Sequence, residues 1–159
     1  METSTETPWL TLAQQVSWRD YMVGTTALID QLDRDLRQGH GISLHEYEIL
    51  VRLSEAEGHA IRMAELAASL SHSRSRITHT ISRLEKADYV ARGQCADDGR
   101  GVSAVMTNAG YAALREASHT HVKGVHRLLI AQSSDQELEV IGHVFARILD
   151  TLNVPRLPA

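Results

Sequence analysis

Cysteine is almost absent from this chain, whose only one is Cys95. A single cysteine excludes an internal disulfide. No apolar run is long enough to cross a bilayer, although the hydrophobic fraction of 43% suits a folded protein. The first ten residues, METSTETPWL, lack the basic and apolar segments of a signal peptide. We therefore expect a cytoplasmic protein with no membrane partner.

The sequence also lacks the short motifs of common enzyme classes. It contains no Gly-x-Ser-x-Gly, no Walker A, no His-Glu-x-x-His and no glycine-rich dinucleotide motif. Nothing in the sequence places a histidine as a base for Cys95. We therefore predict that the protein is not an enzyme and needs no cofactor.

Net positive charge is missing too, because the formal charge at pH 7 is −4. This total argues at first against a nucleic-acid partner. The acidic residues, however, gather toward both ends, whereas the middle of the chain carries several arginines: Arg74, Arg76, Arg83, Arg92 and Arg100. A local basic face matters more for DNA binding than the total charge, so DNA stays a candidate partner.

Residues 71–86 have the pattern of an amphipathic helix. At about 100° per residue, one stripe is apolar and suits packing on a core: Ile77, Ile81 and Leu84. The opposite side carries hydrogen-bond donors: Arg76, His79 and Arg83. Three serines near its start are candidates to cap the helix or to donate to a phosphate: Ser71, Ser73 and Ser75.

The surroundings of this segment predict a winged helix-turn-helix. A short helix is expected over 63–70, and only a few residues separate it from the next, which is helix-turn-helix geometry. Strand-like runs at 89–92 and 102–106 then enclose a turn-rich segment, as in a β-hairpin wing. Near its tip, Arg100 is placed for a minor groove, and Asp98 is placed to orient the guanidinium.

Helical patterns on both sides complete a mainly α fold with a small β-hairpin wing. One runs from Trp9 to Gln38, and another opens at the capping box Ser43-Leu-His-Glu46. After a very short strand at 61–62 and the wing, helices are expected from Asn108 to about Ala131 and from the Ser134 capping box to about Leu152. We divide the chain into a disordered N-terminus (1–8), a winged helix-turn-helix DNA-binding domain (42–106) and a helical dimerisation region (9–39 and 107–154).

The chain resembles the MarR family of bacterial transcription regulators over nearly its whole length. Two segments carry most of the resemblance: LSHSRSRITHTISRLEKADYVAR (70–92) and CADDGRGVSAVMTNAG (95–110). The second contains the D-x-R wing signature as Asp98-Gly99-Arg100, with Met106 where the family usually has leucine. Trp18-Arg-Asp-Tyr21 and the segment 42–47 resemble an actinobacterial branch.

The resemblance implies a homodimer that regulates transcription, and we predict a ligand-responsive repressor that binds a palindromic operator in double-stranded DNA. We expect the outward donors of 71–86 to face the major groove or its flanking phosphates: Arg76, His79 and Arg83. Phosphate anchors are expected at the start of that helix: Ser71, Ser73, Arg74 and Ser75. Arg100 is expected to enter the adjacent minor groove beside Asp98.

The resemblance also implies an effector pocket between the dimerisation layer and the winged unit. An aromatic acid is the kind of effector that many members of the family bind. The matching regions offer these candidate lining residues: Trp18, Arg19, Tyr21, Met22, Tyr47 and Met63. Arg19 is the candidate partner for the acid group.

Nine histidines raise the alternative of a metal-responsive regulator with the same fold. The densest cluster is His119, His121 and His126. On a regular helix His119 and His121 point about 200° apart and cannot both bind one ion, so we predict no metal site. A further alternative is a helix-turn-helix that binds only protein, which the shortage of acids on the outward face of 71–86 disfavours.

Overall fold

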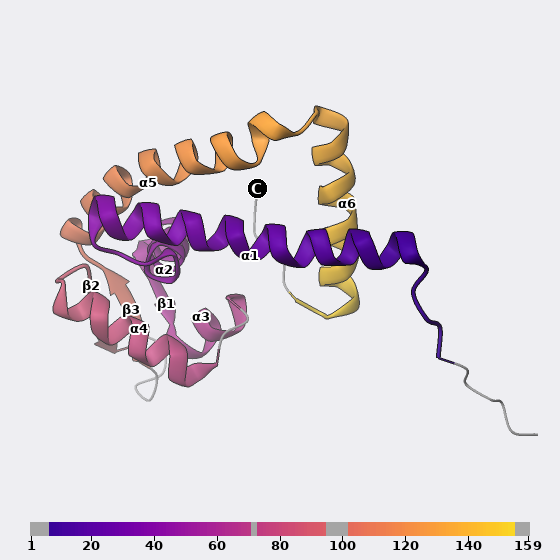
Figure 1. The fold of residues 1–159 in the computed structure, drawn as a ribbon. Helices are drawn as coiled ribbons and strands as arrows, with labels where there is room; N and C mark the ends of the chain where they lie inside the picture. Colours follow the sequence, from indigo (N-terminus) through magenta and orange to yellow (C-terminus); the bar gives the residue numbers. More distant parts are fainter. Residues whose placement is uncertain (1–6, 71–72, 95–101, 155–159) are drawn as a thin grey trace, which may run out of the picture.

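The computed structural model describes residues 7–70, 73–94 and 102–154. The elements follow this order: α1 (Leu12–His40), α2 (Leu44–Glu55), η1 (Glu57–His59), β1 (Ala60–Arg62), α3 (Met63–Ser69), α4 (Arg74–Lys86), β2 (Val90–Gln94), β3 (Val102–Met106), α5 (Asn108–Leu128), η2 (Ile130–Gln132) and α6 (Asp135–Thr151). The winged unit, which comprises α2 to β3, lies at one end of the molecule, and α1 and α5 lead away from it toward α6 (Figure 1). None of the described helices has the length and apolar character needed to span a membrane.

The helix starts follow local capping chemistry. The predicted capping boxes at Ser43 and Ser134 are both present, and Thr107 caps α5 by accepting a hydrogen bond from the Gly110 N–H. The first helix begins at Leu12 and not at Trp9, because Thr11 forms a capping box with Gln14. It continues to His40 and ends at Gly41, whose φ of 69° is the left-handed conformation that glycine adopts without strain.

Within the described residues the β-sheet has three strands, in the order β1-β3-β2, and both pairings are antiparallel. The predicted wing hairpin is confirmed by the pairing of β2 with β3. The very short strand expected near Ile61 pairs with the other side of β3, where Ile61 lies opposite Ala104. The sheet therefore ties the start of α3 to the base of the wing.

The core of the winged unit is closed within one chain. Leu50 of α2 is 0% exposed and packs in a cluster with side chains from α3, α4, β3 and α5. The start of α5 lies very close to the sheet, because a Cβ on Gly110 would come within 2.1 Å of the Tyr89 carbonyl oxygen. Glycine at this position lets α5 pack against the wing base.

The C-terminal part of α1 packs on α5. Leu32 and Leu36 are buried there, and Gly124 of α5 gives Leu32 room, since a Cβ would lie 2.7 Å from its Cδ2. The helix predicted to run to about Ala131 ends at Leu128, where the chain changes to the tighter turn η2. This break turns α6 away from the axis of α5 (Figure 1).

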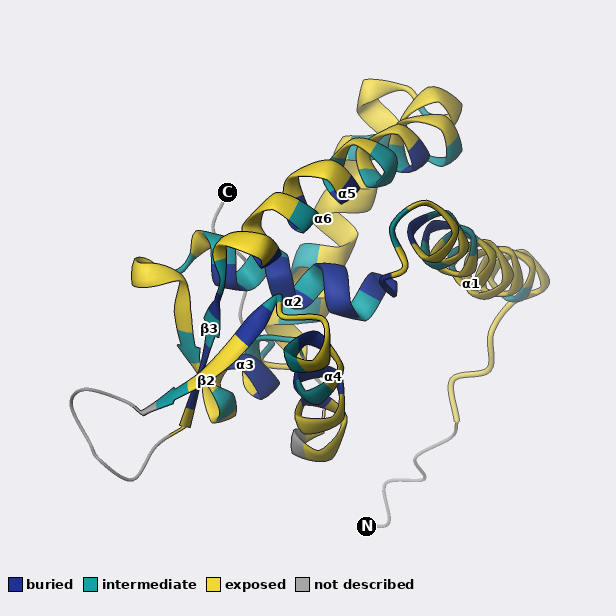
Figure 2. Cartoon of the chain, turned by 90° about the vertical axis from the view of Figure 1, so that its left-hand side faces the viewer, coloured by how far each residue is buried: buried dark blue, intermediate teal, exposed yellow. Residues whose placement is uncertain are grey.

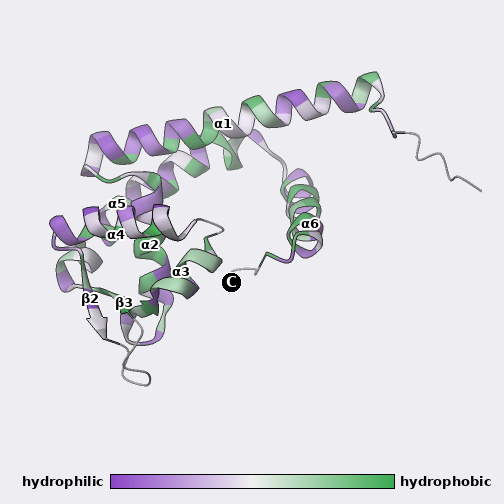
Figure 3. Ribbon diagram, turned by 90° about the horizontal axis from the view of Figure 1, so that it is seen from below, coloured by the Kyte–Doolittle hydropathy of each residue, from purple (hydrophilic) through white to green (hydrophobic). Residues whose placement is uncertain are grey.

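The outer half of the molecule buries very little. No residue of α6 is buried. The N-terminal half of α1, which we call its outer half, is mostly exposed (Figure 2). Both segments nevertheless contain apolar residues along their length (Figure 3). The two segments touch through Tyr21 and Phe145, whose rings lie 5.6 Å apart.

Candidate nucleic-acid interface

Helix α4 begins after a serine cap. Ser73 Oγ accepts a hydrogen bond from the Arg76 N–H at 3.2 Å, so the helix starts at Arg74 and not at Ser71. The predicted apolar stripe is confirmed, because all three of its members are buried: Ile77, Ile81 and Leu84. No acidic residue occurs in the first turn.

The exposed side of α4 presents polar and cationic side chains. Ser75, Arg76 and His79 are all exposed. Thr80, beneath them, is buried, and its hydroxyl donates to the Arg76 carbonyl oxygen at 3.0 Å. The helix thus offers hydrogen-bond donors to solvent on one side while the other side fills the core.

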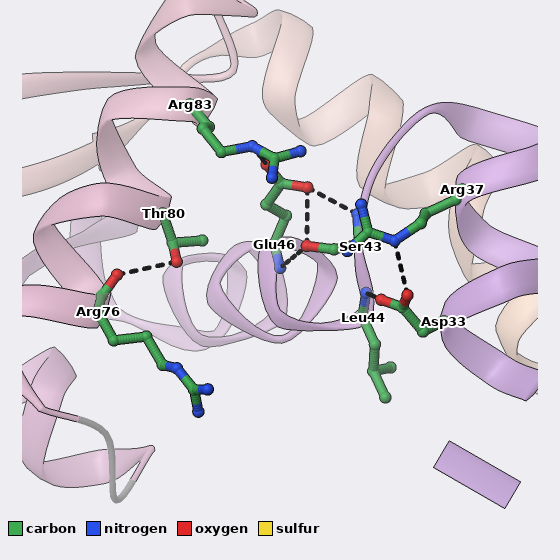
Figure 4. A network of polar contacts seen from close by, with 8 residues as sticks. All are labelled: Asp33, Arg37, Ser43, Leu44, Glu46, Arg76, Thr80 and Arg83. Atoms are coloured by element: carbon green, nitrogen blue, oxygen red, sulfur yellow. Dashed lines mark hydrogen bonds and ion pairs between the residues drawn. The ribbon is translucent and has the colours of Figure 1, made fainter. Parts of the chain in front are cut away.

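Arg83 is exposed too, but it turns toward α2. Its Nε lies 3.0 Å from Oε1 of Glu46, a residue in the first turn of α2 (Figure 4). Oε2 of the same carboxylate accepts hydrogen bonds from the N–H and the hydroxyl of Ser43, at 2.6 and 2.8 Å. Glu46 therefore both caps α2 and holds the guanidinium of Arg83.

The opposite flank of α4 is held by the base of the wing. Nε of Arg92, on β2, lies 3.0 Å from Oε2 of Glu85, and its NH2 group donates to the hydroxyl of Ser82 at 3.0 Å. This ion pair and this hydrogen bond thus join strand β2 to α4.

The α2 helix start is tied to α1 by Asp33. One carboxylate oxygen accepts the Leu44 N–H at 2.8 Å, and the other pairs with Arg37 at 2.6 Å (Figure 4). Burial raises the pKa of Asp33, but the hydrogen bonds from Arg37 and Leu44 outweigh this effect, and the net pKa lies below its ordinary value of 3.8. The same pairing raises the pKa of Arg37.

Some predicted DNA-contact residues lie outside the described residues: Ser71, Asp98 and Arg100. Arg74 is the first residue of α4. Ser73, Ser75, Arg76, His79 and Arg83 all come from this one helix or its cap, so the structure brings the described candidates together at a single element.

Comparison with known proteins matches this architecture. The sequence model described as "MarR family" matches residues 40–101. AbsC, a MarR family transcriptional regulator from Streptomyces coelicolor, is 37% identical, with a TM-score of 0.87, over 92% of this chain and 99% of AbsC. The chain belongs to the MarR family.

Two further relatives extend the comparison. Sco3205, a MarR family transcriptional regulator from Streptomyces coelicolor solved in complex with DNA, has a TM-score of 0.90 and 34% identity over 93% of this chain and 92% of that one. The transcriptional repressor MprA of Escherichia coli K12 is 28% identical over 72% of this chain, and the match spans 66% of MprA. The Streptomyces relatives agree with the predicted actinobacterial branch. The relatives are transcriptional regulators and not enzymes, as predicted.

The candidate effector residues of this MarR family member fall into two groups. The first group lies on the outer half of α1 and is exposed: Trp18, Arg19, Tyr21 and Met22. Trp18 is 54% exposed and stacks on Tyr21 with ring centroids 5.8 Å apart. The second group belongs to the winged unit, where Tyr47 is buried and Met63 is half-buried. Asp33 contacts Leu44 at the start of α2, three residues before Tyr47. Trp18 precedes Asp33 by 15 residues, about 22 Å along the helix, so Trp18 lies far from Tyr47 within one chain.

Tyr47 contacts a histidine of α5. Its ring lies 4.5 Å from that of His121, and its hydroxyl donates to Ser118 at 3.3 Å. Burial lowers the pKa of His121, an effect that the charge of Glu48 partly opposes. This histidine therefore favours its neutral form.

The histidines do not form a metal cluster in the part of the chain that the structure describes. No group of three His, Cys, Asp or Glu side chains within 7–70, 73–94 and 102–154 is arranged to hold an ion. His121 packs on Tyr47, whereas His119 and His126 are exposed. The metal-responsive alternative gains no support.

Sequence reasoning missed the partners that hold α4. Glu46 was interpreted only as part of a capping box, and Arg92 only as part of a basic region. A buried carboxylate and an arginine 37 residues apart have no periodicity that would pair them. The only signal was chemical, since a glutamate that becomes buried on folding needs a cationic or hydrogen-bonding partner.

Proposed function

We propose that this protein is a transcriptional repressor that binds a palindromic DNA operator as a homodimer and responds to a small ligand. The observation that carries the proposal is the exposed, acid-free outer side of the first turns of α4, directly followed by the wing. The DNA complex of Sco3205, a relative with the same fold, supports the choice of partner. Chromosomal DNA would place its action in the cytoplasm.

We assign the DNA contacts by chemistry. Arg76 and His79 face the major groove, where an arginine can pair with guanine O6 and N7. Arg83 lies two turns beyond Arg76 on the same side, at the edge of this surface. The phosphate anchors are those at the helix start: Ser71, Ser73, Arg74 and Ser75. Arg100 enters the minor groove beside Asp98.

A second copy of the chain supplies the missing cover for the outer helices. The exposed apolar residues of α6 lie close along one helix: Ile141, Val144, Phe145 and Ile148. More apolar side chains are exposed on the outer half of α1. Contiguous apolar surface of this kind marks an association site. Two copies related by a two-fold axis would present two α4 helices to the two halves of a palindrome.

The ligand response is assigned to the aromatic residues near this interface. Tyr21 already contacts both Trp18 and Phe145, and association would add the second chain beside them. An aromatic acid paired with Arg19 would act only if it bound the DNA-free arrangement more tightly than the DNA-bound one. Melting temperatures with a panel of aromatic acids, combined with gel shifts, test this; no stabilisation and no release of DNA would exclude such a ligand.

The central experiment is selection of bound duplexes from a random library, followed by gel shift and sedimentation. We expect a dimer and an enriched inverted repeat with half-sites about 10 base pairs apart or a multiple of that. A monomer that binds all duplexes equally would contradict the proposal. Repression as opposed to activation is supported by relatives named as repressors, MprA and YetL, and a reporter gene behind the selected site would test it.

A further inference from the structure

Two arginine–carboxylate pairs hold α4 from opposite flanks. Arg83 pairs with Glu46 of α2, and Glu85 pairs with Arg92 of β2. Arg83 and Glu85 are two residues apart, so their side chains leave the helix about 200° apart. One pair therefore restrains rotation of α4 in one direction about its axis, and the other restrains it in the opposite direction.

Glu46 is well placed for orientation and unable to touch DNA. Its side chain is 5% exposed, against 46% for Arg83. Ser43 donates to Oε2 and Arg83 lies against Oε1, so both oxygens have protein partners (Figure 4). A buried carboxylate held at both oxygens gives Arg83 a fixed anchor.

Apolar packing alone leaves the rotation of α4 loosely defined. Ile77, Ile81 and Leu84 pack without directional bonds. If the tip of a side chain lies about 6 Å from the helix axis, a rotation of the helix by about 20° displaces that tip by about 2 Å. That shift exceeds the distance range of an N–H···O hydrogen bond to a base edge. Recognition of a base sequence therefore requires directional bonds, such as the ion pairs on the two flanks of α4, that fix the rotation of the helix.

The anchor also connects α4 to α1. Asp33 of α1 accepts the Leu44 N–H, two residues before Glu46, so the first turn of α2 is bonded to helices on both sides. The chain of contacts runs from α1 through Ser43, Leu44 and Glu46 to Arg83 (Figure 4). A change in the position of α1 therefore acts directly on the anchor of α4.

We propose that Glu46 and Arg83, together with Glu85 and Arg92, are positioning residues that set the rotation of α4 for sequence recognition. Arg83 acts through Glu46 and does not read a base. The inference rests on the proposed DNA-binding function. It separates the cationic residues of α4 into Arg76, which faces the duplex, and Arg83, which orients the helix.

The test is a double-mutant cycle on the full-length protein with Glu46→Gln, Arg83→Gln and the double variant. Competition binding measures the ratio of affinities for the selected operator and for a random duplex, at several salt concentrations. We expect each single variant to lower this ratio about tenfold, the size of one mismatched base pair. In the double variant, the decrease in this ratio should be no larger than the smaller of the two single-variant decreases. The salt dependence of binding should not change.

The second flank has its own cycle. Arg92→Gln and Glu85→Gln should lower the same ratio, again without adding to each other. Arg115→Gln is the matched control, because it breaks an exposed ion pair within α5, 3.5 Å to Glu116, at a site that joins α5 to neither α1 nor α4. It should keep the wild-type ratio.

Two results would overturn the inference. In the first, Arg83→Gln lowers the slope of log affinity against log salt by about one while Glu46→Gln keeps the wild-type ratio, so that Arg83 contacts phosphate directly. In the second, both variants keep the wild-type ratio. The ratio of two affinities at one salt concentration is independent of the folded fraction, so partial unfolding cannot imitate a change in this ratio. A wild-type protein that fails to distinguish the two duplexes would instead refute the proposed function.

Discussion

The winged unit and the outer helices place their apolar side chains differently. In the winged unit, Leu50, Leu66 and Ile81 are all 0% exposed and the core is closed by elements of one chain. In the outer part, Phe145 is 37% exposed and no residue of α6 is buried. The contrast is between one region whose core is closed within a single copy and another whose exposed apolar surface we propose a second copy covers.

The largest effect is expected from Leu50→Ala, which tests whether the winged unit is self-contained. Deleting this fully buried side chain should reduce the free energy of unfolding by about 2–5 kcal/mol. Ile148→Ala on α6 is the matched deletion. Chemical denaturation at several protein concentrations should show that only the Ile148→Ala loss depends on concentration. Equal dependence in both variants would remove the distinction between the regions.

Phe145→Asp should separate the two regions more directly. A charge placed in the apolar surface of α6 should dissociate the dimer, because burying an unpaired carboxylate is strongly unfavourable. Sedimentation should show monomers whose circular dichroism keeps most of its helix signal. His143→Asp is the control, since His143 is exposed and points about 200° from Phe145 on the same helix. Dissociation by both variants would indicate a general effect of charge.

Arg76→Ala tests the part of the comparison that concerns DNA. We expect a loss of about 1–3 kcal/mol in operator binding with an unchanged dimer, if Arg76 reads a base. Arg115→Ala removes the same charge from an exposed site on α5 and should bind the operator normally. Gel shifts at two salt concentrations measure both. Equal losses would mean that total charge, and not the position of Arg76, controls binding.

The smallest effect is expected at the joint between the regions. The pKa of Asp33 is lowered in the folded protein, so its carboxylate stabilises the fold above pH 3.8, and this contribution disappears as the pH falls through the lower folded value. Asp33→Asn should therefore lower the melting temperature at pH 7. The corresponding loss in the free energy of unfolding should be less than about 1 kcal/mol. The difference from the wild type should shrink in acid below pH 3.8. A constant difference across the pH range would contradict the assigned role of the charge.

Local patterns predicted the elements that depend on local bonds. The capping boxes at Ser43 and Ser134 join groups three residues apart, so their sequence spacing is enough to identify them. The burial of Ile77, Ile81 and Leu84 follows from helical periodicity in the same way. The start of α1 was predicted three residues early, because the Thr11–Gln14 capping box was not recognised.

Long-range contacts were beyond such patterns. The pairing of β1 with β3 joins residues more than 40 positions apart, and a strand of three residues carries too little periodicity to indicate its partner. The end of α5 at Leu128 was also missed, since apolar residues continue through Ile130 while the backbone changes to a tighter turn.

The sequence by itself determined the helices, the wing hairpin and the acid-free outer surface at the start of α4, because each depends on residues that are neighbours along the chain or on one helix face. Only the tertiary structure decided that Arg83, which is exposed like Arg76, turns to Glu46. These two arginines have the same chemistry and lie on the same side of α4. They differ because α2 places the buried carboxylate of Glu46 beside Arg83. Only the packing of α2 against α4 creates this contact.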